Sequence, residues 1–300
     1  QTTNKFLLKI APAPLPPSDE YGVGLVFMPH DADARQTITE LFARIIAEEG
    51  QTLLGWRDVP TDDSLVGPSA VAVEPRFAQI FIASTKSGGV SEPAEIGQER
   101  FERKLYIIRK RVENAVDALT IAAEQKKQFY VCNLSSKTLV YKGMLNADQL
   151  GPQFPDLQDP DFESALALVH QRFSTNTFPN WPLAHPFRFV AHNGEINTLT
   201  GNINWMRARQ GLLKSSIYGD DLQKLLPVIR EGGSDTATFD NVLEFLHMTG
   251  RSLPHAILMM IPEPWQNHES MDEDLKAFYE YHSSLMEPWD GPASTAFPHG

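Results

Sequence analysis

Two short polar clusters in the middle of the chain carry residue types that can bind a small ligand. In the first, residues 166–177, an apolar run leads into His170, Arg172 and Ser174. Residues two apart on a strand share a face, so these three side chains are predicted to point the same way. A buried arginine is unfavourable unless an anion meets it, and its planar group pairs with carboxylates through two hydrogen bonds. Arg172 is therefore predicted to bind a carboxylate, either of a ligand or of the protein itself.

The second cluster, residues 189–197, contains the pair Asn193 and Gly194 after another short apolar run. One interpretation is a plain hairpin turn, because both residue types tolerate positive φ. The other is an oxyanion hole, in which the Asn193 amide and an adjacent backbone N–H donate to one developing negative oxygen. Such a donor is worth ~3 kcal/mol in a transition state, and glycine lets a ligand approach the backbone closely.

A third stretch, residues 231–240, holds a Gly-Gly loop followed by Ser234 and Asp235. Either residue can cap the helix expected after it. Alternatively, the Asp235 carboxylate can receive the ammonium group of a ligand. Together, the three stretches offer an arginine for a carboxylate, an aspartate for an ammonium and an oxyanion hole for an acyl group. This combination suits an α-amino acid with a side-chain amide or ester.

A metal hydrolase is the competing chemical hypothesis, because His170, His185 and His192 cluster near the same stretches and three such ligands can hold zinc. Their spacing fits no helical ligand motif. The interpretation favoured here is that His170 and His192 orient the strand ends by hydrogen bonds, and no metal site is predicted.

The elements that would position these residues follow from hydrophobic periodicity and turn residues. Residues 1–20, with four prolines between 11 and 17, are predicted to be an extended connector. Runs of alternating or buried character predict strands over residues 22–28, 53–56, 78–82, 129–134, 138–141, 165–173, 187–191 and 252–261. Three-four apolar spacing predicts helices over residues 31–49, 98–126, 198–213, 236–249 and 272–286. Paired strands separated by helices indicate an α+β fold with helices packed on sheets.

The composition restricts the class of partner. The net charge of −12 argues against nucleic acid and anionic membrane as main partners. The apolar runs are far shorter than the ~20 residues that a membrane-spanning helix needs. Cys132 is the single cysteine, which excludes a disulfide within the chain and fits a reducing, cytoplasmic location.

Several phrases of the sequence resemble a known family. They read His-Gln-Arg-Phe-Ser-Thr at 170–175 and His-Asn-Gly-Glu at 192–195, followed by Ser-Asp at 234–235. These phrases resemble class II glutamine amidotransferases, the N-terminal-nucleophile type. Asn-Ile-Asn-Trp-Met at 202–206 and Met-Glu-Pro-Trp-Asp-Gly at 286–291 are similar to the amidotransferase domain of the glutamate synthase family. The resemblance implies a four-layer αββα sandwich, with the amidotransferase domain over residues 21–300.

The resemblance also implies roles for the polar residues. Arg172 would bind the α-carboxylate of glutamine, and Asp235 would hold its α-ammonium. The Asn193 side chain and the Gly194 N–H would form the oxyanion hole. Ammonia would pass to a second site, where 2-oxoglutarate becomes glutamate. The implied partners are glutamine, the remaining domains of the large subunit and a small reductase subunit. FMN and an iron–sulfur cluster are implied elsewhere in the parent enzyme, and no cofactor is expected in this segment.

The nucleophile is where the sequence departs from the family, whose attacking cysteine stands at the mature N-terminus before Gly-Val-Gly. Here Tyr21 precedes that phrase, and a tyrosine with a pKa near 10 and no free α-amine does not replace the cysteine. Residues 21–28 are interpreted as an internal strand, and Cys132 as a small buried hydrophobe. The domain is therefore expected to be N-terminally incomplete, so that this chain alone binds without turnover. The alternative is a non-catalytic glutamine-binding or subunit-interaction module.

Overall fold

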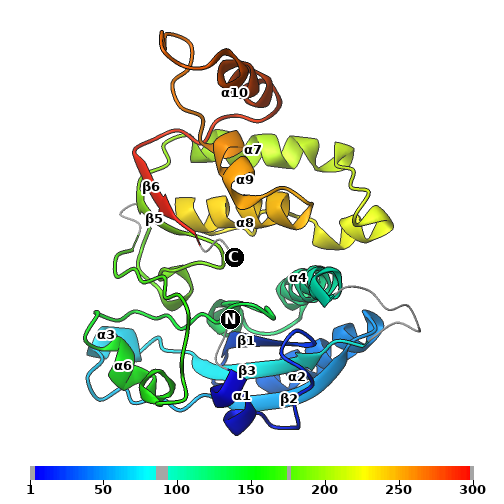
Figure 1. The fold of residues 1–300 in the computed structure, drawn as a ribbon. Helices are drawn as coiled ribbons and strands as arrows, with labels where there is room; N and C mark the ends of the chain where they lie inside the picture. The colour runs from blue at the N-terminus through cyan, green and yellow to red at the C-terminus, as the bar shows by residue number, and fades with distance from the viewer. Residues whose placement is uncertain (1–3, 86–93, 174–176, 298–300) are drawn as a thin grey trace. The chain divides into compact units, whose positions relative to one another are not determined.

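The computed structural model describes residues 4–85, 94–173 and 177–297, without the side chains of residues 94 and 95 (Figure 1). It divides into two compact units. Unit 1 comprises Gln1–Ala167 and Asn180–Ala184, and unit 2 comprises Leu168–Pro179 and His185–Gly300. The mixed helix and sheet content expected from the sequence is present in the described residues.

Unit 1 is built on an antiparallel sheet of four strands in the order β2-β3-β1-β4. The strands are β1 (Tyr21–Met28), β2 (Thr52–Asp58), β3 (Arg76–Ala83) and β4 (Tyr130–Val131). All of β1 is buried, because it is central and both of its faces are covered. β2 is half-buried instead of fully buried as predicted, since it lies at the edge of the sheet.

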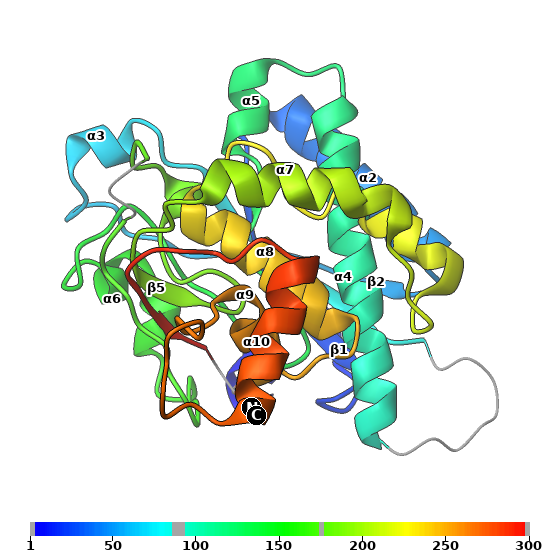
Figure 2. The same cartoon turned by 90° about the horizontal axis from the view of Figure 1, so that it is seen from above.

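Helices α2 (Ala32–Glu48) and α4 (Ala94–Ala118) pack on one face of this sheet (Figure 2). The α2 helix forms where the periodicity predicts it, with apolar residues three and four apart facing the sheet. The Asp31 carboxylate caps its start by accepting from the Ala34 N–H, and Gly50 ends it with a φ of +71°. The opposite face of the sheet packs against Val140, Phe154 and Trp181.

Several expectations for unit 1 are wrong in detail. Helix α1 (Asn4–Ile10) occupies part of the expected connector, because Phe6 and Leu7 are buried against β1 and β3. The expected helix over 98–126 is interrupted, and α5 (Ala123–Gln128) is separate from α4. The strands expected over residues 129–134 and 138–141 reduce to β4 and one bridge between Val23 and Ser135. The remaining short helices of unit 1 are α3 (Pro68–Val71), α6 (Leu150–Gln153), η1 (Pro155–Gln158) and η2 (Trp181–Leu183).

Unit 2 contains one antiparallel strand pair, which lies side by side in Figure 1, and a set of helices. The strands are β5 (Ala191–Gly194) and β6 (Ala293–Ala296). The helices are α7 (Leu199–Arg209), η3 (Gln210–Leu212), η4 (Gly219–Leu225), α8 (Asp235–Met248), α9 (Leu253–Met260) and α10 (Glu273–Leu285). Helices α7, α8 and α10 fall where the periodicity predicts helices. None of the described helices of either unit is long and apolar enough to cross a membrane.

Three further strand predictions are wrong. Residues 165–173 form no strand where the structure describes them, and Leu166 and Val169 are exposed without a pairing neighbour. The strand expected at 187–191 is shifted to β5, because the preceding backbone bonds to a side chain instead of a strand. Residues 252–261 form helix α9, since Ser252 caps the start and Pro254 suits the first turn.

Candidate active site

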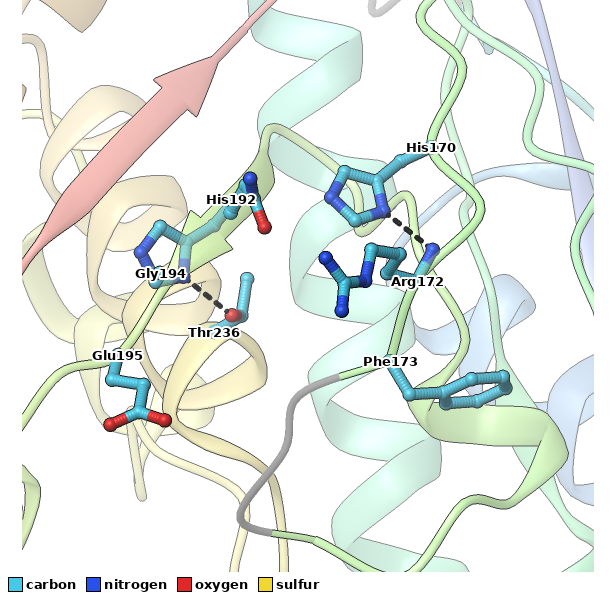
Figure 3. A pocket seen from close by; sticks show the side chains of 8 residues that line it. His170, Arg172, Phe173, His192, Gly194, Glu195 and Thr236 are labelled. Carbon is cyan, nitrogen blue, oxygen red and sulfur yellow. Dashed lines mark hydrogen bonds between the residues drawn. The ribbon is translucent and has the colours of Figure 1, made fainter.

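The polar clusters singled out in the sequence meet at one cavity in unit 2, with a volume of about 150 Å³ (Figure 3). An apolar cavity of similar size holds benzene, so the space suits a small molecule. The lining residues come from the segment before residue 174, from β5 and its end, and from the start of α8. They are His170, Arg172, Phe173, His192, Asn193, Gly194, Glu195 and Thr236.

Strand β5 presents a free backbone edge at this cavity. The N–H groups of Glu195 and Asn197 donate to the carbonyls of Pro292 and Asp290, at 3.0 and 2.7 Å, on the β6 side. Successive residues of an antiparallel strand direct their N–H groups to opposite edges. The Gly194 N–H therefore points away from β6 and is available to a ligand. This geometry excludes the hairpin-turn interpretation, because Asn193 and Gly194 lie within a strand.

Only glycine fits at position 194. Its φ of +146° is unfavourable for side-chain-bearing residues, and a Cβ there would lie 1.8 Å from the Pro292 carbonyl oxygen. Gly291, on the segment that faces Gly194 and leads into β6, has the same restriction, because an added Cβ would lie 1.9 Å from the Glu195 carbonyl oxygen. The two backbone segments approach closely at both glycines, and this close approach fixes the path of the backbone at Gly194, whose N–H faces the cavity.

The backbone of Arg172 is held by two histidines. Its N–H donates to His170 Nδ1 at 3.0 Å, and its carbonyl accepts from His185 Nδ1 at 2.9 Å. The two imidazole rings stack with centroids 4.4 Å apart. Burial lowers the pKa of His170, against an opposing hydrogen-bond contribution from the His192 backbone, so the ring stays neutral at pH 7. These contacts agree with the expectation that His170 orients the segment through hydrogen bonds.

The Arg172 guanidinium extends toward His192 and Gly194 in Figure 3. Arg172 is exposed, and among the described residues its guanidinium forms no ion pair with a carboxylate. The sequence left open whether the anion belongs to a ligand or to the protein. Among the described residues, the protein supplies no such anion to the exposed guanidinium.

The Thr236 hydroxyl links His192 to Asp235 behind β5. It lies 2.9 Å from His192 Nδ1 and donates to Asp235 Oδ1 at 3.4 Å. Burial lowers the pKa of His192, against the opposing effect of the Asp235 charge. The Nε2 atom of His192 is buried and has no hydrogen-bond partner among the described residues.

Asp235 lies behind the cavity wall and is not among the lining residues. Its Oδ2 accepts from the Ile196 N–H at 3.1 Å, and its Oδ1 accepts from the Thr236 N–H at 2.7 Å. Ser234, not Asp235, is the N-cap of α8, because its hydroxyl accepts from the Ala237 N–H. The structure thus brings Arg172, Asn193 and Gly194 to the cavity and sets Asp235 one layer further back.

Asp240 is a positioning residue that the sequence analysis missed. Its carboxylate, fully buried on α8, accepts from the N–H groups of Arg188, Phe189 and Val190 at 3.3, 2.8 and 3.2 Å. Burial raises its pKa to about 6, although the nearby Arg188 guanidinium opposes this rise. The signal in the sequence was an acidic residue between Phe239 and Val242, on the apolar face of the helix.

Three candidates from the sequence analysis remain, namely a metal site, Cys132 and Ser174. No group of three or more His, Cys, Asp or Glu side chains among the described residues could hold a metal ion. Cys132 is buried in the core of unit 1 and is 1% exposed, as expected of a structural cysteine. Ser174 lies outside the described residues.

Comparisons with known proteins cover nearly the whole chain. The family described as "Glutamine amidotransferases class-II" matches residues 2–300. The glutamate synthase (NADPH) large chain of Bacillus subtilis (strain 168) is 48% identical over 286 residues, which are 95% of this chain and 18% of that protein. The glutamate synthase (NADH) of Schizosaccharomyces pombe is 45% identical, over 95% of this chain and 13% of that protein. The ferredoxin-dependent glutamate synthase of Pyropia yezoensis is 39% identical, over 94% of this chain and 18% of that protein. The chain therefore spans less than a fifth of the length of these relatives.

Proposed function

Because this chain belongs to the class II glutamine amidotransferase family, we propose that its cavity binds glutamine for hydrolysis of the side-chain amide. The observation that carries the proposal is the meeting of two groups at one cavity in unit 2. These are the Arg172 guanidinium, which has no carboxylate partner among the described residues, and the Gly194 N–H on the free edge of β5.

Arg172 binds the α-carboxylate of the ligand through its planar fork, and this contact fixes the orientation of the amino acid. The Gly194 N–H and the Asn193 side-chain amide donate to the amide oxygen as it becomes negative during attack. Donors held in place before the reaction stabilise this charge without reorganisation. Both residues line the cavity that contains Arg172.

The α-ammonium is assigned to the Asp235 side of the cavity. A carboxylate offers about four lone-pair sites, and Ile196 N–H, Thr236 N–H and the Thr236 hydroxyl occupy three of them. One lone-pair site is left, and the negative charge shared by the two carboxylate oxygens attracts an ammonium. Asp235 thus has two tasks, because it also holds the backbone that follows β5.

The attacking nucleophile has to come from outside the residues described above. Cys132 lies in the core of unit 1, where a thiol is protected from substrate. In the proposed reaction a cysteine with a free α-amine attacks the amide carbon, and the amine takes up the thiol proton. Ammonia then leaves, and water releases glutamate from the acyl-enzyme. We propose that the domain that includes this nucleophile folds as a four-layer αββα sandwich, and that residues 21–300 belong to it.

The parent reaction is proposed to be glutamate synthesis, in which the released ammonia reacts with 2-oxoglutarate at a second site. The chain's one cysteine is buried, so these residues do not fit an iron–sulfur cluster. We place the cluster and FMN in other domains of the large subunit, with a small reductase subunit as an additional partner. A cytoplasmic location belongs to the same proposal.

The test uses the full-length polypeptide that contains this chain. Replacing Arg172 by alanine should raise the KM for glutamine at least 100-fold, because the contact with the α-carboxylate is lost. The same variant should be nearly unchanged with 4-aminobutanamide, which is glutamine without that carboxylate. Arg44→Ala, on the exposed side of α2 in unit 1, is the matched control. An unchanged KM for glutamine in Arg172→Ala would overturn the proposal.

A further inference from the structure

A second cavity, of about 240 Å³, lies in unit 1 between the first turns of α2 and the end of the sheet. The register of β1, β2 and β3 places Met28, Trp56 and Ala78 on the sheet face that α2 covers. Ala32 and Ala78 are small, so the helix and the sheet leave a gap at this end. The lining residues are Met28, Ala32, Arg35, Gln36, Thr39, Trp56, Asp58, Arg76 and Ala78.

Hydrogen-bond donors dominate the polar groups of this cavity. Trp56 Nε1 is buried and has no acceptor among the described residues, whereas buried polar groups are normally paired. Arg35 Nη1 donates to the carbonyls of Pro29 and His30, which hold its guanidinium at the cavity wall. Arg76 lies opposite, with its guanidinium 3.8 Å from the Asp58 carboxylate. The indole N–H of Trp56 and the guanidinium groups of Arg35 and Arg76 therefore line this cavity. The one acidic residue among its lining residues is the exposed Asp58.

The charge balance defines the ligand. Arg35 and Arg76 give two positive charges and Asp58 one negative charge, so the cavity is net positive in a chain of net charge −12. A monoanion balances that excess. Of the helix amides that often bind phosphate, the Ala34 N–H at the start of α2 is already used, because it donates to the Asp31 carboxylate. Met28, Ala32 and Ala78 give the cavity an apolar floor, which suits a ligand with an apolar body.

We propose that this cavity is a binding site for a small organic carboxylic acid with an apolar body. Its carboxylate accepts from the Arg76 and Arg35 guanidinium groups and from Trp56 Nε1. Its apolar part lies over Met28 and Ala78. Asp58 competes with the ligand for Arg76, because both are carboxylates. The site lies wholly within unit 1 and uses no residue of the glutamine cavity.

The experiment measures benzoate binding to the full-length protein by saturation-transfer NMR and calorimetry, with benzamide as a neutral probe of the same shape. Benzoate should bind, and benzamide should bind at least tenfold more weakly. Arg76→Gln should weaken benzoate binding at least tenfold, and Trp56→Phe about threefold. Asp58→Asn should tighten binding about threefold, because it removes the competing carboxylate. Arg44→Gln, an exposed arginine further along α2, is the control and should bind benzoate like the parent.

The opposite signs expected for Arg76→Gln and Asp58→Asn separate a ligand site from loss of folding, since a misfolded variant cannot bind more tightly. Equal binding of benzamide and benzoate would overturn the proposal. An unchanged affinity in both Arg76→Gln and Asp58→Asn would do the same. Displacement of benzoate by inorganic phosphate at lower concentration than by unlabelled benzoate would overturn the ligand class.

Discussion

Strands β1 and β5 are held in place in two different ways. β1 has a strand on each side, pairs with β3 along all eight of its residues, and is buried throughout. Among the described residues, β5 has a strand neighbour on one side only, and carboxylates of α8 hold the backbone at both of its ends. Asp240 accepts from the three residues before it, and Asp235 accepts from Ile196 after it. The second arrangement leaves one edge of β5 free for a ligand.

The difference shows what a binding edge requires. A ladder on both sides would occupy the Gly194 N–H, which has to remain available for the proposed oxyanion. Ionised side chains replace the missing strand without covering that edge. Burial raises the pKa of Asp240 to about 6, so we expect the position of β5, unlike that of β1, to depend on the protonation of this carboxyl group.

The largest effect is expected from Gly194→Ala, which tests whether the free edge of β5 is needed. A Cβ at this position would meet the Pro292 carbonyl oxygen and displace the strand. Glutaminase activity of the full-length protein should fall up to about 1,000-fold, as for loss of an oxyanion donor. Gly67→Ala, with open space around its Cβ in unit 1, is the control. Full activity of Gly194→Ala would refute the role of the free edge.

Asp240→Asn tests the dependence of β5 on a titratable group. Since burial raises the pKa of Asp240 to about 6, its contribution to stability is complete at pH below the unfolded value of 3.8 and is lost as pH rises through 6. Relative to the Asn variant, the parent should therefore lose about 3 kcal/mol of local stability between pH 4 and 7.

Amide hydrogen exchange of the peptide over residues 186–197, corrected for intrinsic rates, measures this difference in the full-length protein. Exchange of a peptide over residues 21–28 in β1 should be the same in both proteins. Parallel pH profiles for the parent and the variant at residues 186–197 would show that Asp240 does not hold β5.

Asp235→Asn separates the two tasks proposed for that residue. An asparagine oxygen can still accept from the Ile196 N–H, so β5 should stay in place. The negative charge is lost, and the KM for glutamine should rise about tenfold. For 4-carbamoylbutanoate, which lacks the α-ammonium, the KM should not change. An equal rise for both substrates would leave Asp235 with a positioning role alone.

The smallest effect is expected from Thr236→Val, which removes the hydroxyl between His192 and Asp235. His192 then loses its hydrogen bond to this hydroxyl, and kcat should fall about threefold with little change in KM. The control is Thr39→Val in unit 1, whose hydroxyl bonds only within α2. A pH profile of kcat that is identical in Thr236→Val and the parent would indicate that this hydrogen bond is immaterial to the reaction.

Sequence reasoning placed the components of the site better than it placed the strands around them. Arg172, Asn193 and Gly194 were identified by residue type, and they line one cavity. Helices α2 and α8 were predicted because their caps and apolar spacing are local signals. Asp240 was missed because its partners are backbone groups about fifty residues earlier in the chain.

Strand errors have a related cause. Residues 165–173 have the apolar pattern of a strand, but pairing needs a neighbour that local pattern cannot reveal. Residues 252–261 are apolar enough for a strand or a helix, and the cap at Ser252 decided the outcome. Conversely, β6 has a polar, exposed sequence and was not predicted, since it is defined by its bonds to β5.

The pairing of β5 with β6 also sets the order in which the molecule can assemble. Gly194 faces Ala293, so about 100 residues separate the two partners along the chain. At the usual speed of protein synthesis, that stretch takes about 5–20 s to make. The strands β1 to β3 can pair during this interval, because their partners are already available. The cavity beside β5 is therefore completed only after β6 has been made, and until then β5 is exposed to pairing with wrong partners.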